Sequence, residues 1–192
     1  MNKKISDTNV VYDVAIKSPL ERAAKISSLI GCDVYLKRED LQSVHSFKIR
    51  GAYNKIAHLT PEQKSAGIIT ASAGNHAQGV ALSAKKLKLN AIVVMPATTP
   101  RIKIDAVKSF GAKVVLHGDS YSDSFAHAQE LKTQNGMTFV HPFDDEKVIE
   151  GQGTIGTEII EDLSDVTHVF VPVGGGGLLA GVSRVLKANN PK

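Results

Sequence analysis

Short, nearly continuous apolar runs alternate along the chain with longer segments whose apolar residues recur at a helical period. Runs of this kind are typical of parallel strands that are buried on both faces. The pattern predicts strands at residues 34–37, 68–70, 91–95, 113–116, 138–140 and 168–173.

The segments between these runs carry helix signals. One helical face would be formed by Ala77, Val80, Ala81, Ala84 and Leu87. Pro100 suits the first turn of the next helix, and Gly111 suits its end. A last helix is expected over residues 178–188. Strands that alternate with helices in this way predict βαβ units, and therefore an α/β fold with a parallel sheet.

Composition narrows the class of protein. The 192-residue chain is 42% hydrophobic and 22% charged, which excludes a mainly disordered protein. Its net charge of +4 comes from scattered lysines and arginines, so a nucleic-acid-binding face is not favoured. No apolar run approaches the ~20 residues of a membrane-spanning helix. The first seven residues lack the apolar core of a signal peptide. We expect a cytoplasmic protein.

Metal and disulfide chemistry are not expected. Cys32 is the only cysteine, which excludes an intrachain disulfide and a thiolate zinc cluster. Its expected place is a buried one, where it would act as a small apolar side chain. No metal-ligand spacing relates His58, His117, His127, His141 and His168.

Four consecutive glycines, residues 174–177, follow the last predicted strand and precede the last predicted helix. A glycine turn at a helix start exposes several backbone N–H groups beside the positive end of the helix, which favours a phosphate. A tight turn without a ligand is the alternative. A nucleotide P-loop is excluded because no Gly-Lys-Ser/Thr follows. A formal match of residues 175–180 to a dinucleotide fingerprint is weak, since this strand does not open the sheet.

Lys48 lies between Phe47 and Ile49, where a helix is expected to begin. Desolvation and a positive helix end both favour the neutral, nucleophilic amine. The alternative is a solvated surface lysine.

A polar turn at residues 72–79 also joins a predicted strand to a predicted helix. Ser72, the amides of Gly74 and Asn75, and His76 could hold a carboxylate there. The alternative is a helix N-cap made by Ser72 or Asn75. A phosphate-binding glycine turn, a nucleophilic lysine and a carboxylate-binding turn together indicate pyridoxal phosphate (PLP) and an amino-acid substrate.

The same motifs resemble the threonine dehydratase (threonine ammonia-lyase) family of fold-type II, tryptophan-synthase-β-like PLP enzymes. The resemblance covers roughly residues 18–185 and rests on residues 37–40, 45–52, 72–79 and the tetraglycine run. Threonine synthases and cysteine synthases typically carry Asp where this chain has Ile49. Serine racemases typically carry a serine where it has Ala73, so dehydration is favoured over racemisation. Val44-His45 looks more like the biosynthetic than the catabolic branch.

The resemblance implies a role for each site residue. Lys48 would bind PLP covalently and remove the substrate's α-proton, and Phe47 would pack against the cofactor ring. Asn75 would bind the ring's 3-oxygen. The phosphate would be held by Gly174, Gly175, Gly176, Gly177 and the Leu178 amide. The substrate carboxylate would be held by Ser72, Ala73, Gly74, Asn75 and His76. The implied reaction converts L-threonine, or L-serine, to a 2-oxo acid and ammonia, as in the first step of isoleucine biosynthesis.

The resemblance also implies a domain organisation. The fold would be a parallel-sheet three-layer sandwich in which a small domain, residues 51–143, is inserted in a larger one. Residues 1–50 and 144–192 would form part of that large PLP-binding domain. In the family this domain continues further, through the residue that faces the pyridine nitrogen. We therefore expect a truncated catalytic domain with doubtful activity alone, and a homo-oligomer for the full-length enzyme.

Two alternatives stay open. One is a serine dehydratase or another β-eliminating PLP lyase. The other is a non-catalytic fragment that binds PLP or a partner protein.

Overall fold

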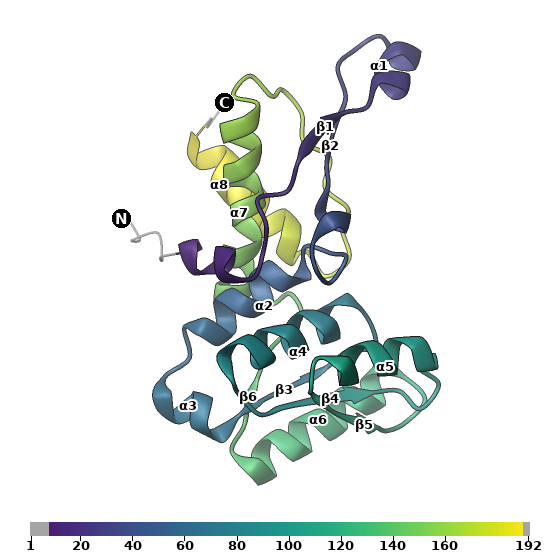
Figure 1. The fold of residues 1–192 in the computed structure, drawn as a ribbon, viewed down its shortest axis with the longest axis vertical. Helices are drawn as coiled ribbons and strands as arrows, with labels where there is room; N and C mark the ends of the chain where they lie inside the picture. Colours follow the sequence, from purple (N-terminus) through teal and green to yellow (C-terminus); the bar gives the residue numbers. More distant parts are fainter. Residues whose placement is uncertain (1–7, 190–192) are drawn as a thin grey trace.

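The computed structural model describes residues 8–189 of the chain. Its helices and strands follow the alternation expected from the sequence (Figure 1). The elements are η1 Thr8–Asp13, β1 Leu20–Arg22, α1 Ala24–Ile30, β2 Tyr35–Lys37, η2 Glu39–Leu41, α2 Lys48–Ala57, α3 Pro61–Ala66, β3 Ile68–Ala71, α4 Asn75–Leu87, β4 Ala91–Met95, α5 Arg101–Ser109, β5 Lys113–Leu116, α6 Tyr121–Asn135, β6 Thr138–Phe139, α7 Glu146–Asp162 and α8 Gly177–Asn189.

A four-stranded sheet of order β5-β4-β3-β6, with every pair parallel, forms the middle layer. Helices α4 and α5 cover one face and α6 covers the other (Figure 1). Along β4, Val93 and Met95 pack on the α4 side while Val94 packs on the α6 side. Because both faces are covered, the strand can be apolar throughout. The predicted α/β class with a parallel sheet is confirmed.

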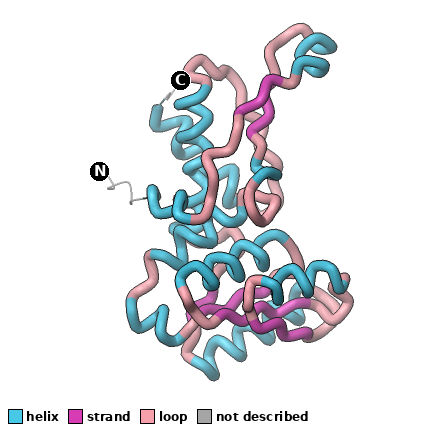
Figure 2. The backbone as a smooth tube through the Cα atoms, viewed as in Figure 1, coloured by secondary structure: helices cyan, strands magenta, loops and turns pink. Residues whose placement is uncertain are grey.

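Helix α3 lies beside β6, and the other remaining elements lie at one end of this sandwich (Figure 1). Helices α7 and α8 pack against each other, and α7 also packs on α2. Strands β1 and β2, with α1 between them, project away from the sheet (Figure 2). The boundary predicted at residue 51 falls within α2, and the division into two domains remains a proposal.

Three expectations from the sequence are corrected. Residues 35–37 form a strand, but it pairs antiparallel with β1 in a separate two-stranded sheet and is partly exposed. Residues 168–173 form no strand, because no described residue pairs with their backbone. Phe170 in that segment is 93% exposed. Cys32 is exposed rather than buried, in the turn between α1 and β2.

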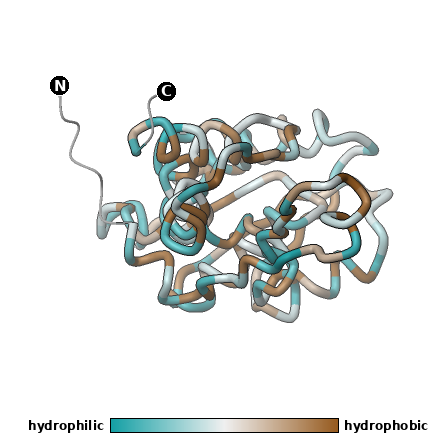
Figure 3. Tube along the Cα trace, turned by 90° about the horizontal axis from the view of Figure 1, so that it is seen from above, coloured by the Kyte–Doolittle hydropathy of each residue, from teal (hydrophilic) through white to brown (hydrophobic). Residues whose placement is uncertain are grey.

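Among residues 8–189, no helix combines the length and the hydropathy needed to cross a membrane. Figure 3 shows hydrophobic and hydrophilic residues interleaved along the chain.

A buried ion cluster anchors α2. Arg50, fully buried, donates to Glu39 Oε1 at 2.7 Å and to Glu158 Oε2 at 3.0 Å. Glu158, also fully buried, accepts from Tyr12 at 2.8 Å and pairs with Lys37 at 2.9 Å. Burial alone would raise the pKa of Glu158, but the hydrogen bonds from Arg50, Lys37 and Tyr12 hold it below its ordinary value. The cluster therefore ties the N-terminal segment, α2 and α7 together.

Arg50→Met is expected to lower the free energy of unfolding by about 3–5 kcal/mol, because Glu39 loses its cation and the buried Glu158 keeps only Lys37. Urea denaturation of both proteins measures this loss. The control is Lys17→Met, which removes the exposed ion pair with Glu161 and should change stability little. Equal effects of the two substitutions would contradict the account.

Candidate active site

The candidate site lies where the parallel strands β3 and β6 end. Val140 continues β6, and its N–H donates to the Ile69 carbonyl at 2.9 Å. Its carbonyl accepts from Thr70 Oγ1 at 2.9 Å and from His76 Nε2 at 3.0 Å. These bonds hold the end of β3, the start of α4 and Val140 together. Ligands of open α/β sheets bind at this carboxyl edge.

Lys48 begins α2 beside this edge. A Cβ on Gly79 of α4 would lie only 3.2 Å from the Lys48 carbonyl carbon and oxygen, so the missing side chain lets the two helices approach closely. The Lys48 Nζ donates to the Pro142 carbonyl at 2.6 Å and lies 5.4 Å from the centre of the Phe47 ring. Burial lowers the pKa of Lys48. The alternative of a solvated surface lysine does not hold.

His76 is buried beside Lys48. Burial lowers its pKa to about 3, and the nearby Lys48 acts in the same direction. The ring is therefore neutral, with its proton on Nε2 for the bond to Val140. Among residues 8–189 nothing hydrogen-bonds to Nδ1. A neutral side chain offers no charge to a carboxylate, so a contribution from His76 would come from its backbone N–H in the first turn of α4.

The turn that precedes α4 does not cap the helix with a side chain. Its N-cap residue is Gly74, and neither Ser72 nor Asn75 occupies that position. The Ser72 hydroxyl instead accepts from the Gly74 N–H at 3.2 Å. Asn75 is exposed at the helix start. The alternative of a plain N-cap by Ser72 or Asn75 is wrong, and the first-turn N–H groups of α4 have no helical partner.

The tetraglycine run forms a loop that rests on Phe143. A Cβ on Gly175 would overlap the Phe143 ring, and one on Gly177 would lie 2.7 Å from the Phe143 carbonyl oxygen. Gly176 has a φ of +84°, which an L side chain rarely adopts. Because α8 begins at Gly177, its first N–H groups have no helical partner. Leu178 packs in the same apolar cluster as Phe47.

Two adjacent residues connect the lysine to the glycine loop. The Pro142 carbonyl holds the Lys48 amine, and Phe143 supports Gly175 and Gly177. Sequence reasoning missed both residues, and for His141 it noted only that no metal-ligand spacing relates it to the other histidines. Only their place directly after the end of a predicted strand could have indicated them.

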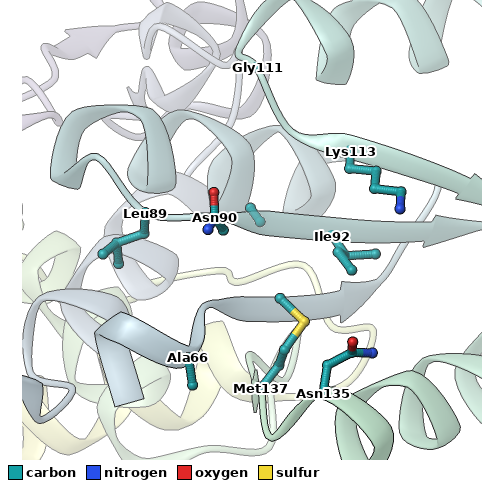
Figure 4. Close-up of a pocket in the computed structure, with 9 residues that line it drawn as sticks. Ala66, Leu89, Asn90, Ile92, Gly111, Lys113, Asn135 and Met137 are labelled. Carbon is teal, nitrogen blue, oxygen red and sulfur yellow. The ribbon is translucent and has the colours of Figure 1, made fainter. Parts of the chain in front are cut away.

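A hollow of about 400 Å³ lies at the opposite, amino-terminal ends of the strands, where β3, β4 and β5 begin (Figure 4). Asn90, Lys113 and Met137 are among the residues that line it. It contains none of the predicted site residues. In the part of the chain that the structure describes, no group of three or more His, Cys, Asp or Glu side chains could hold a metal ion.

The donors at the carboxyl edge fit PLP. A half-buried amine with a lowered pKa can bond to the aldehyde. The glycine loop lies close to Phe143 because Gly175 and Gly177 have no Cβ. It presents helix-start N–H groups, which suit a phosphate. A second helix start, that of α4, presents further N–H groups beside the amine. These features together fit a PLP-binding site.

Comparison with known proteins leads to the same class of protein. A family model described as pyridoxal-phosphate dependent enzyme matches residues 11–192, and the chain belongs to this family. It is 59% identical over 181 residues to threonine dehydratase of Nicotiana attenuata, covering 94% of this chain and 30% of that protein. It is 54% identical over 182 residues to the L-threonine dehydratase biosynthetic IlvA of Pasteurella multocida, covering 95% and 36%.

The solved structures include a similar one. The processed form of threonine deaminase isoform 2 from Solanum lycopersicum matches with a TM-score of 0.94 and 52% identity, over 100% of this chain and 54% of that one. The resemblance to threonine dehydratases is confirmed. The chain spans about a third of the curated relatives named above and about half of this solved chain.

Proposed function

We propose that this chain is the part of a PLP-dependent threonine dehydratase that carries the cofactor lysine and the phosphate loop. The whole enzyme would convert L-threonine to 2-oxobutanoate and ammonia, and L-serine to pyruvate and ammonia. The observation that carries the proposal is the Lys48 amine, which is half-buried, has a lowered pKa, and is held by the residue next to the one that supports the glycine loop. The threonine dehydratases found by comparison support the substrate.

We assign a role to each residue of the site. Gly174, Gly175, Gly176, Gly177 and the Leu178 amide would hold the cofactor phosphate, Phe47 would pack against the ring, and Asn75 would bind the ring's 3-oxygen. The turn from Ser72 through Ala73 and Gly74 to Asn75, with the His76 amide, would bind the substrate carboxylate. When bound, PLP supplies an electron sink that makes the α-proton of an amino acid removable.

Lys48 would then act as the base. In its neutral form, the amine that donates one hydrogen to the Pro142 carbonyl would keep its lone pair for the α-proton, which would move from the substrate Cα to Nζ. The β-hydroxyl would leave as water with a proton equivalent to the one removed from Cα, and hydrolysis of the remaining C–N bond would release ammonia and the 2-oxo acid. Ala73 has no hydroxyl that could act as a second base, which supports dehydration over racemisation.

An assay of the complete enzyme that contains this chain tests the proposal. With L-threonine we expect 2-oxobutanoate and ammonia in equal amounts, and with L-serine pyruvate but no D-serine. Turnover of serine with strong discrimination against threonine would instead favour a serine dehydratase. PLP binding without turnover of either amino acid would favour the non-catalytic alternative, and both results count against the proposal.

Three finer predictions belong to the same proposal. The biosynthetic branch, and with it the first step of isoleucine synthesis, is supported by the Pasteurella multocida relative. A cytoplasmic location remains a prediction, to be tested by fractionation. A homo-oligomer of the full-length enzyme also remains a prediction, to be tested by its mass in solution.

A further inference from the structure

His141 makes contacts that the proposed catalytic roles do not use. Its Nδ1 accepts the backbone N–H of Asp144 at 2.7 Å and that of Phe143 at 3.3 Å. Because Nδ1 accepts both bonds, a neutral ring must carry its proton on Nε2. The ring also meets the Phe143 ring edge-on, with centroids 4.7 Å apart and an interplanar angle of 84°.

These bonds close a turn at residues 141–144. The turn contacts Lys48 on one side of the site and the glycine loop on the other. Pro142, inside the turn, accepts the Lys48 amine at 2.6 Å. Phe143, next in the chain, lies against Gly175 and Gly177 so closely that a Cβ on either glycine would overlap it. The position of this one turn therefore fixes both the amine and the glycine loop.

We propose that His141 is a positioning residue, whose Nδ1 holds the turn that sets the Lys48 amine and the glycine loop at the correct separation for one PLP molecule. The inference rests on the proposed function, because it concerns that same cofactor site. His141 itself touches neither the cofactor nor the substrate in this account. It acts through Pro142 and Phe143.

Two substitutions separate the acceptor from the ring. The side-chain oxygen of Asn readily accepts the N–H groups two and three residues further along the chain, so His141→Asn keeps the acceptor and loses the ring. His141→Phe keeps a flat ring beside Phe143 and loses the acceptor. A purely structural role for the ring would make Asn the worse substitute.

The experiment titrates the complete enzyme that contains this chain, and each variant of it, with PLP, traps bound cofactor with borohydride, and measures pyridoxyl-modified Lys48 by mass spectrometry. We expect His141→Phe to need about tenfold or more PLP for half-maximal labelling, as the loss of two hydrogen bonds implies. His141→Asn should stay within about threefold of wild type. Equal half-maxima for wild type and His141→Phe, or a larger loss in His141→Asn, would overturn the inference.

Hydrogen exchange without PLP gives an independent readout that also covers a variant that folds poorly. The amides of Phe143 and Asp144 should be protected in wild type and His141→Asn, and should exchange faster in His141→Phe while the amides of β3 and β4 stay protected. Unchanged protection at residues 143 and 144 in His141→Phe would contradict the role. If wild type itself takes no label at Lys48, the proposed function fails as well, whereas labelling that is insensitive to His141 refutes the inference alone.

Acidification adds a signature that only a titrating residue can give. Lys48, His76, Asp144 and Asp145 face His141, and burial, as the largest influence, lowers its pKa below the ordinary value. Protonation of Nδ1 removes the acceptor, so the bonds persist at neutral pH and are lost as pH falls through this lowered pKa. Protection of the Asp144 amide should therefore fall on acidification in wild type and persist in His141→Asn. The same acid response in both proteins would refute this role of Nδ1.

Discussion

Lys48→Ala is expected to abolish covalent capture of PLP and to reduce threonine turnover by the complete enzyme by at least about 10²–10⁴-fold. The lower bound follows from the loss of a positioned proton-transfer group alone. The amine is the half-buried group whose pKa burial lowers, and it is directed at the Pro142 carbonyl rather than into solvent. Removing it takes away both the covalent link and the base.

A second lysine provides the control for this variant. Lys147 is ion-paired with Glu150 at 2.8 Å on α7, and a paired cation is a poor nucleophile. Lys147→Ala should retain full labelling by PLP and borohydride. Labelling of Lys48→Ala to the wild-type extent, or its loss in Lys147→Ala with the fold intact, would remove Lys48 from the mechanism.

Gly175→Ala is expected to weaken PLP binding by about 5–150-fold. The added methyl group overlaps the Phe143 ring, so either the ring or the glycine loop must move. Inserting one carbon into such a contact costs about 1–3 kcal/mol. This free energy corresponds to a rise in the Kd for PLP of about 5–150-fold. The loss should appear in the PLP concentration needed for half-maximal labelling, with the fully labelled amount unchanged.

A double-substitution cycle tests whether Phe143 is the cause. In a Phe143→Ala background the ring is absent, so the additional loss caused by Gly175→Ala should shrink to a few-fold at most. An equal loss in both backgrounds would show that the contact with Phe143 does not set the position of the loop.

The sheet could be predicted from sequence because its strands are covered on both faces. In β3 and β4 alternate residues contact α4 and α6, so apolar residues are required at nearly every position. Residues 168–173 carry the same pattern and yet form no strand, because a strand needs a hydrogen-bonded neighbour and none of residues 8–189 supplies one. A hydrophobic run therefore does not by itself predict a buried strand, because both its burial and its pairing depend on residues elsewhere in the chain, and Phe170 in this run is 93% exposed.

The candidate site was predictable in part for a similar reason. Lys48 and the tetraglycine run carry local signals, namely apolar flanks and an improbable composition. Pro142 acts through its carbonyl oxygen, on a lysine that lies 94 residues away in sequence. Phe143 acts through its ring, on glycines about 30 residues away. A backbone carbonyl is present at every position, so no residue type marks the one that is used. His76 shows the converse, since its type indicates charge while burial keeps it neutral.

Peptide mapping of the complete wild-type enzyme that contains this chain, after incubation with PLP and reduction with borohydride, tests the central claim most directly. The account predicts one pyridoxyl group per chain, on the peptide that contains Lys48, and its competitive loss when inorganic phosphate occupies the glycine loop. Modification spread over the exposed lysines, with Lys48 unmodified, would contradict it.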